Sequence, residues 1–294
     1  MEIVEVGPRD GLQNEAVMVS TDDKIEFIER TIASGLRRIE ATSFVHPKRV
    51  PQMADAEAVM AGVPRRPDVS YIGLVLNRRG FERAAAAGVD EVNCVILASE
   101  TFSQRNQGMS VAESVQIVRE IVEDARSAEI ALSVTIGAAF GCPFEGEIAE
   151  EVVYALARQM GDLGVAEIAL ADTIGVGVPA QVSRLVAGAA MAAPGVRLRC
   201  HFHNTRNTGY ANAFAALDAG VTVLDAATGG IGGCSFAPNA TGNVATDDLV
   251  YMLDRSHRKS GADLEQLIAT SRWLQGVLGN VSGQLVRAGG FPST

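Results

Sequence analysis

A strand–helix–strand pattern runs through residues Glu91–Gly137, EVNCVILASETFSQRNQGMSVAESVQIVREIVEDARSAEIALSVTIG. Its two ends, Glu91–Leu97 and Ala131–Gly137, are short apolar runs with β-branched residues, which are typical of strands. Ser110, with Glu113 three residues later, predicts a capping box at the start of a helix between them. The apolar stripe of that helix consists of Val111, Val115, Val118, Val122 and Ala125. Units of this kind build parallel sheets.

The same alternation of strand and helix continues along the chain. The predicted strands are Ile3–Val6, Arg38–Ala41, Val69–Leu76, Glu91–Leu97, Ala131–Gly137, Glu167–Ala171, Arg197–Phe202 and Val221–Ala227. Helices are expected at Val244–Leu253, in the eighth repeat, and at Leu264–Leu278 beyond it. Because eight repeats favour a closed barrel over an open sheet, we predict an α/β fold. It is a (β/α)8 TIM barrel, one domain over residues 1–294, with an extra C-terminal helix.

Composition restricts the classes of partner. The formal net charge of −10 argues against nucleic acid, because phosphate binding needs clustered Lys and Arg. No apolar stretch is long enough to cross a bilayer, so no membrane partner is expected. Cys94, Cys142, Cys200 and Cys234 are scattered and form no CxxC pair, which is typical of a reduced protein. With an apolar strand rather than a targeting segment at the start, these features predict a cytoplasmic protein.

Polar and ionisable residues gather at the carboxyl ends of five predicted strands, where TIM barrels place their active sites. They are Arg9 and Asp10 after the first strand, Glu40 in the second, Asp172 after the sixth, His201 and His203 at the end of the seventh, and Cys234 and Asn243 in and after the glycine-rich loop that follows the eighth. Buried charge is costly unless it is paired or bound to metal. The clustering therefore indicates a functional site, and the loop, Gly229–Gly242, could close over it.

His201 and His203 give the sharpest local signal. Residues two apart on a strand point to one face, so both imidazoles can face the barrel axis. Alone, the pair suits packing as well as ligation, but its place at a strand end favours a metal site. Asp10 could add a carboxylate and Asn243 an amide oxygen, although Asp10 also suits a turn and Asn243 a helix N-cap. Such a mixture of ligands suits Mg²⁺ or Mn²⁺ better than structural zinc.

The remaining candidates concern charge and proton transfer. Arg9 can supply a fixed cation for an oxyanion, unless it is a surface arginine. Cys234 lies among glycines whose amides could lower its pKa, whereas free cysteines are more often buried small hydrophobes. Asp172 and Glu40 can carry protons or orient ligands, and the alternative for both is an ion pair at a strand end.

Six segments together resemble the 3-hydroxy-3-methylglutaryl-CoA lyase family, part of a metal-dependent barrel superfamily that also contains isopropylmalate and homocitrate synthases. They are VEVGPRDGLQNE (Val4–Glu15), IEATSFVHPKRVPQM (Ile39–Met53), FGCPFEG (Phe140–Gly146), ADTIGVG (Ala171–Gly177), HFHNTR (His201–Arg206) and GGCSFAPNATGNVATDDLVYML (Gly232–Leu253). The resemblance covers nearly the whole chain, and the first and last segments are long and specific.

The resemblance implies a catalytic barrel that performs a metal-dependent retro-Claisen cleavage of 3-hydroxy-3-methylglutaryl-CoA to acetyl-CoA and acetoacetate, a step of leucine degradation. It implies that Asp10, His201, His203 and Asn243 bind the metal, that Arg9 binds substrate and stabilises an enolate or carbonyl oxygen, that Cys234 transfers a proton, and that Glu40 and Asp172 fill further functional positions. The expected partner is an acyl-CoA thioester. A homo-oligomer, in the first place a dimer, is also expected.

Departures from the family pattern leave the acyl group open. Asn204 and Arg206 follow the His pair where the family has Asp and no arginine, and Ser235, His46 and Arg49 replace Pro, Ser and Trp. A lyase for citramalyl-CoA or another 3-hydroxyacyl-CoA is therefore an alternative. The GGC loop resembles the lyases rather than the synthases, whose loop has the form G-E-x-x-G-N, so a condensing synthase is less favoured. A barrel that only binds is the third alternative.

Overall fold

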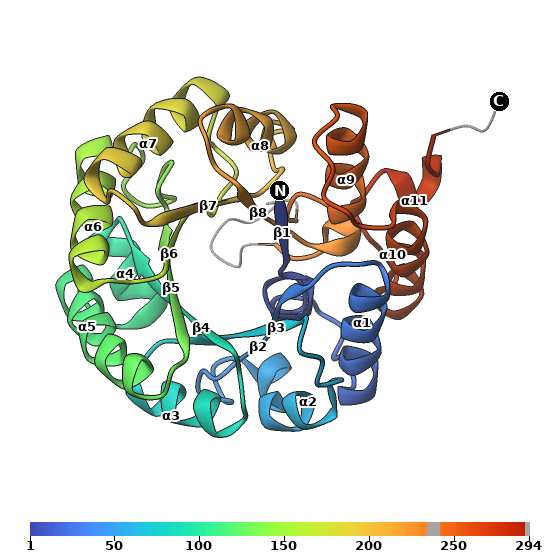
Figure 1. Cartoon of the computed structure of the whole chain (residues 1–294), viewed down its shortest axis with the longest axis horizontal. Helices are drawn as coiled ribbons and strands as arrows, with labels where there is room; N and C mark the ends of the chain where they lie inside the picture. Colours follow the sequence, from blue (N-terminus) through green and yellow to red (C-terminus); the bar gives the residue numbers. More distant parts are fainter. Residues whose placement is uncertain (234–241, 292–294) are drawn as a thin grey trace.

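The computed structural model describes residues 1–233 and 242–291. Within these residues eight parallel strands, β1–β8, pair in sequence order and close into a barrel. β1 pairs with both β2 and β8, which completes the ring. Figure 1 shows the strands as an inner ring with the helices outside it. The predicted (β/α)8 barrel is confirmed.

The strands are short and buried. They are β1 (Glu2–Glu5), β2 (Arg38–Ser43), β3 (Ser70–Val75), β4 (Glu91–Leu97), β5 (Ala131–Gly137), β6 (Glu167–Asp172), β7 (Arg197–Phe202) and β8 (Val223–Ala226). Every residue of β2, β6 and β8 is buried, because helices cover the sheet outside and side chains fill it inside. β4 and β5 have the predicted bounds, and they pair from Glu91 with Ala131 to Leu97 with Gly137.

Helices surround the barrel. They are α1 (Thr21–Ala33), α2 (Ala56–Gly62), α3 (Arg78–Ala86), α4 (Glu100–Gln107), α5 (Val111–Ser127), α6 (Glu150–Leu163), α7 (Pro179–Ala192), α8 (Gly209–Asp218), α9 (Thr246–Arg255), α10 (Leu264–Leu278) and α11 (Leu285–Ala288), with short turns η1 (Gly7–Gly11), η2 (Pro51–Met53) and η3 (Thr228–Gly230). The predicted capping box of α5 forms, since the Ser110 hydroxyl accepts a 3.1 Å bond from the Glu113 amide and the Glu113 carboxylate accepts one of 2.7 Å from the Ser110 amide. Of the helices in the described ranges, none has the length and apolarity needed to span a bilayer.

The extra C-terminal helix is also confirmed. α10 has the predicted bounds and packs against α1 and α9 on the outside of the barrel. Phe27 of α1 and Trp273 of α10 lie with ring centroids 6.3 Å apart. α10 therefore seals the flank where the first and last helices of the ring meet.

The start of α9 differs from the prediction. The helix begins at Thr246, and its N-cap is Ala245 rather than Asn243. The chain before it is extended: the Val244 amide donates to the Phe202 carbonyl at 3.1 Å, and Ala245 forms a parallel bridge with Ala227. The N-cap interpretation of Asn243 is therefore wrong, because this segment is hydrogen-bonded across the ends of β7 and β8 before it turns helical.

A buried ionic cluster occupies the amino-terminal end of the barrel interior. Arg38, the first residue of β2, binds Glu91 and Glu167, the first residues of β4 and β6, at 2.8 and 2.9 Å. All three side chains are at most 10% exposed, so these charges are stable only as a set. Arg199 of β7 lies one layer higher, 3.4 Å from Glu167.

Glu5, at the end of β1, is fully buried and joins three segments around the site. Its carboxylate accepts hydrogen bonds from the Gly7 amide of η1 (2.9 Å), the Thr228 amide and hydroxyl of η3 (2.8 and 2.7 Å) and the Thr246 hydroxyl of α9 (2.8 Å). Burial raises the pKa of Glu5 to about 7, although these hydrogen bonds lower it.

Glu5→Gln is expected to remove a pH dependence of stability. The folded pKa of Glu5 is raised, so the folded state holds its proton more tightly than the unfolded state does. The free energy of unfolding of the unmodified protein should therefore fall as pH rises from about 4.5 to about 7, by about 3 kcal/mol from this group. Glutamine can keep the two amide hydrogen bonds and donate to the threonine hydroxyls.

Urea unfolding at intervals from pH 5 to 8 measures the difference between the two proteins, with Glu29→Gln on the exposed face of α1 as control. Parallel curves for Glu5→Gln and the unmodified protein would contradict the prediction.

Candidate metal centre

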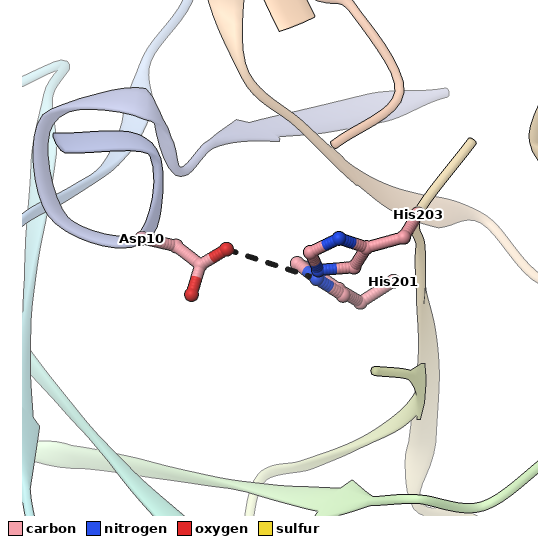
Figure 2. A group of neighbouring side chains, drawn as sticks. All are labelled: Asp10, His201 and His203. Carbon is pink, nitrogen blue, oxygen red and sulfur yellow. Dashed lines mark ion pairs between the residues drawn. The ribbon is translucent and has the colours of Figure 1, made fainter. Parts of the chain in front are cut away.

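Asp10, His201 and His203 come together at the carboxyl end of the barrel. Figure 2 shows the imidazoles of His201, on β7, and of His203, directly after it, facing the Asp10 carboxylate on η1. Their ligand atoms all lie within 4.8 Å of one another, and the His201 Nε2 is 3.9 Å from the Asp10 Oδ2. A group of this composition and spacing could hold one metal ion.

The local structure explains the arrangement. His201 and His203 are two residues apart at the end of β7, so both point inward, and they are 8% and 4% exposed. Asp10 lies in η1, a π-helical turn in which the Asp10 and Gly11 amides both donate to the Val6 carbonyl, at 2.8 and 3.1 Å. The turn interpretation of Asp10 is therefore confirmed, and the same turn carries the carboxylate toward the two histidines, so it does not conflict with a ligand role.

Asn243 lies directly beside the pair of histidines. It forms an antiparallel bridge with His203, and its side-chain amide donates to the Asp10 carboxylate at 2.9 Å and to the Ile231 carbonyl at 3.1 Å. Its side-chain oxygen is buried and accepts no hydrogen bond from the described residues. A buried acceptor of this kind costs free energy unless a partner binds there, so the residue fits a ligand role.

The electrostatics of the interior also fit a divalent cation. A chain of ion pairs and histidine–carboxylate contacts, none longer than 3.9 Å, runs from Glu40 through Arg9, Asp10, His201, Asp225, Arg199, Glu167 and Arg38 to Glu91. With neutral histidine and every other group ionised, its five carboxylates and three guanidiniums carry a formal charge of −2. Buried charge of one sign needs a counterion, and two of the candidate ligands, Asp10 and His201, lie within this chain.

Burial raises the pKa of Asp10, but the Arg9 guanidinium and the two imidazoles have the larger combined effect and hold that pKa well below its usual range. The carboxylate is therefore ionised, as a metal ligand must be. Its low basicity makes Asp10 a weak general base.

Arg9 is held rigidly beside the cluster. Its guanidinium donates to the Glu40 carboxylate at 2.8 Å and to the Asp10 carboxylate at 2.8 Å, and the residue is only 9% exposed. The surface interpretation of Arg9 is therefore wrong, whereas the ion-pair interpretation of Glu40 is confirmed. Burial raises the pKa of Glu40 above its ordinary value, even though Arg9 lowers it.

Asp172 ends β6 and is 1% exposed. Within the described part of the chain, both hydrogen bonds to its carboxylate come from backbone amides, those of Val176 and Gly177, each at 2.9 Å. Its carboxylate therefore shapes the loop before α7 and forms no ion pair with a described residue. Burial raises the pKa of Asp172, against the effect of these two bonds.

Cys234 and Ser235 lie outside the described residues. The loop that leads to them starts against η1 and the residues that follow it: Asn14 donates to the Gly233 carbonyl at 2.8 Å, and the Gly232 amide donates to Glu15 at 3.2 Å. A Cβ on Gly232 would lie 2.8 Å from the Gly11 Cα, so this close approach requires glycine. Cys94, Cys142 and Cys200 are buried, as predicted.

Two residues of the site were not predicted. The Asp225 carboxylate of β8 lies at hydrogen-bond distance, 3.2 Å, from the His201 Nδ1, and Arg199 of β7 lies 3.4 Å from Asp225. Both are buried. In the sequence, each of them is a charged residue within an apolar strand. That pattern predicts a side chain in the barrel interior, but it does not show which residue the side chain pairs with.

Comparison with known proteins identifies close relatives. A family model described as HMGL-like matches residues 1–274. The chain is 41% identical over 277 residues to a hydroxymethylglutaryl-CoA lyase of Bacillus subtilis, covering 94% of this chain and 93% of that protein. It is 44% identical over 298 aligned positions to an (R)-citramalyl-CoA lyase of Chloroflexus aurantiacus, covering 98% and 94%.

A solved structure gives a similar result. The structure of an HMG-CoA lyase from Acinetobacter baumannii, in complex with coenzyme A and 3-methylmalate, superposes with a TM-score of 0.96 at 42% identity. The match covers 100% of this chain and 96% of that one.

Proposed function

The chain belongs to the HMGL-like family, and we propose that it is a carbon–carbon lyase that cleaves 3-hydroxy-3-methylglutaryl-CoA to acetyl-CoA and acetoacetate. The observation that carries the proposal is the position of Arg9 beside the Asp10, His201 and His203 group at the carboxyl end of the barrel. The whole barrel, residues 1–294, is then one catalytic domain.

The proposed cofactor is Mg²⁺ or Mn²⁺, held by Asp10, His201, His203 and Asn243. Imidazole, carboxylate and amide oxygen form a mixed ligand set that leaves positions for substrate oxygens, whereas structural zinc prefers thiolates and a closed shell. When bound, the cation acts as a Lewis acid that polarises the oxygens of the substrate.

The residues around the proposed cation site carry out the other steps of the cleavage. Breaking the C2–C3 bond requires loss of the C3 hydroxyl proton and leaves the electron pair on the enolate of acetyl-CoA. Arg9, fixed by Glu40 and Asp10, provides a preorganised positive charge for that enolate oxygen. Asp172, which is paired with Phe202 between the two histidines and whose pKa burial raises, is the proposed acceptor of the hydroxyl proton. Cys234 then protonates the carbon.

Other properties follow from this assignment. The substrate is an acyl-CoA thioester, as in the relatives, and neither nucleic acid nor membrane is a partner. We place the enzyme in the cytoplasm, as a homodimer, with leucine degradation as its metabolic context.

A second candidate is cleavage of citramalyl-CoA. It is favoured by the 44% identity to the Chloroflexus aurantiacus enzyme over 98% of the chain. Arg206 is a specific feature near the mouth: it is exposed, and its guanidinium donates to the carbonyls of Ile174 and Gly175 in the loop after Asp172. Arginine at this position could select among acyl groups that carry a carboxylate.

One assay tests the proposed activity. The purified protein should release acetyl-CoA from 3-hydroxy-3-methylglutaryl-CoA, lose this activity in EDTA and regain it with Mg²⁺ or Mn²⁺. Citramalyl-CoA, assayed at the same concentrations, measures the acyl preference as a ratio of kcat/KM. Release of free CoA from acetyl-CoA and a 2-oxo acid would instead indicate a synthase. If neither thioester is cleaved when metal is present, the lyase proposal is refuted, and the alternative of a barrel that only binds remains.

A further inference from the structure

His201 has a buried acidic neighbour on the adjacent strand. Asp225 of β8 places its Oδ2 3.2 Å from the His201 Nδ1, on the side of the ring opposite the Nε2 that faces Asp10. The pairing of β7 with β8 sets this contact, since Arg199 is opposite Val223 and Cys200 opposite Leu224. His201 and Asp225 each come two residues after a paired position and point inward.

Asp225 has a buried cation on its other side, although neither the Arg199 Nε nor the Asp225 Oδ1 forms a hydrogen bond with a described residue. The Arg199 Nε lies 3.4 Å from its other oxygen, and Arg199 is 2% exposed. The Arg199 guanidinium also lies 3.4 Å from Glu167, which Arg38 holds at 2.9 Å. A guanidinium keeps its charge in proteins, so Asp225 has a permanent cationic partner and its carboxylate acts only as an acceptor.

This geometry selects one form of the imidazole. A ring nitrogen beside an acceptor-only carboxylate must carry the hydrogen. The neutral His201 ring then has its proton on Nδ1, and its Nε2 presents a lone pair toward Asp10. Orientation of a ligand histidine by a carboxylate behind it raises the affinity of a site for metal.

We propose that Asp225 is a positioning residue that fixes His201 in the Nδ1–H tautomer with Nε2 directed at the metal position, and that the charge of Arg199 keeps Asp225 ionised for this purpose. The proposal rests on the proposed ligand role of His201. The competing explanation is that Asp225 and Arg199 are only a structural ion pair between β7 and β8.

Asp225→Asn distinguishes the two explanations. Asparagine has nearly the same shape, but its amide can donate a hydrogen bond to Nδ1. The ring proton then moves to Nε2, where it occupies the lone pair that would bind the metal. We expect the Kd for Mn²⁺, measured by calorimetry without substrate, to rise 10- to 100-fold. Asp55→Asn is the matched control, because it also replaces a carboxylate that pairs with a buried cation, Lys24, but it joins α1 to the start of α2 and is not part of the ionic chain to His201. It should lower Tm without changing the Kd for Mn²⁺ more than twofold.

A second measurement needs neither metal nor turnover. Although burial lowers the pKa of His201, the Asp225 hydrogen bond and the charge of Asp10 raise it, so the metal-free protein labelled with ¹⁵N-histidine is measured at a pH high enough to make the ring neutral. The nitrogen shifts of His201 should then report Nδ1–H in the unmodified chain and Nε2–H in Asp225→Asn. An Nε2–H tautomer in the unmodified chain would overturn the proposal even if the variant does not fold. Equal increases in Kd for Asp225→Asn and Asp55→Asn would also overturn it. If the unmodified protein bound no Mn²⁺, the proposed metal site would fail, and the tautomer alone would decide the role of Asp225.

Discussion

Replacing His203 with alanine is expected to lower kcat by about a thousandfold and to abolish tight binding of Mn²⁺. His203 is 4% exposed, shares the candidate site with Asp10 and His201, and lies beside Asn243. Loss of one of four proposed ligands weakens the Lewis acid that polarises the substrate, an effect worth several kcal/mol in metal enzymes. About 4 kcal/mol corresponds to three orders of magnitude in rate.

The control for His203→Ala is His257→Asn. His257 is an exposed histidine just beyond α9 with a positive φ of 58°, a conformation that asparagine tolerates. Its kcat and Kd for Mn²⁺ should match those of the unmodified protein. Steady-state cleavage at saturating Mn²⁺, together with calorimetry, separates lost affinity from lost chemistry. Near-normal turnover by His203→Ala would show that His203 is not a ligand.

The sequence predicted the barrel because its signals are local. Each strand is a short apolar run, and the helix Leu264–Leu278 shows its period within one segment, so neither needs knowledge of distant residues. The inward direction of His201 and His203 followed from strand alternation alone, and the structure confirms it. Placement of Asp10 opposite them followed from the rule that strand ends converge in a barrel.

The parts that were not predicted depend on pairings between strands. Asp225 is one charged residue in an apolar strand, and only the register of β7 against β8 shows that it faces His201. The start of α9 was misplaced for the same reason: Asn243 and Val244 look like a helix entrance, but His203 and Phe202 hold them in extended form. Sequence patterns describe what a residue prefers, whereas these contacts depend on what the closed barrel brings beside it.

The ionic chain through the interior connects the site residues that the sequence predicted with those that it did not. The cluster at the amino-terminal end of the barrel interior is far in sequence from the proposed ligands. It consists of Arg38, Glu91 and Glu167, and Arg199 and Asp225 connect it to His201. Buried ion pairs add little net stability compared with apolar packing. Here the hydrogen bonds of Arg9 to Glu40 and Asp10 orient its guanidinium, and Asp225 lies 3.2 Å from the His201 Nδ1.

Arg9→Met is expected to lower kcat by about 10²- to 10³-fold with little change in the affinity for Mn²⁺. Arg9 is the fixed cation that we assign to the enolate oxygen, and loss of one preorganised group that stabilises an oxyanion typically costs this much. The substitution also leaves Glu40, which is 2% exposed, without its cation, so stability should fall by about 3 kcal/mol. Arg9→Lys keeps the charge but cannot bridge Glu40 and Asp10 as a fork, and its kcat should be intermediate.

The double variant Arg9→Met with Glu40→Gln separates catalysis from stability. Removing the unpaired carboxylate should recover most of the stability lost in Arg9→Met, about 2 kcal/mol by urea unfolding, because a buried polar amide costs less than a buried charge. It should not recover kcat, because the enolate still lacks its cation. The Asn93 amide, which lies 3.3 Å from the Glu40 carboxylate, can continue to donate to the glutamine oxygen. Recovery of kcat in step with stability would instead mean that Arg9 acts only by holding η1 against β2, and that the enolate charge is balanced by the cation alone.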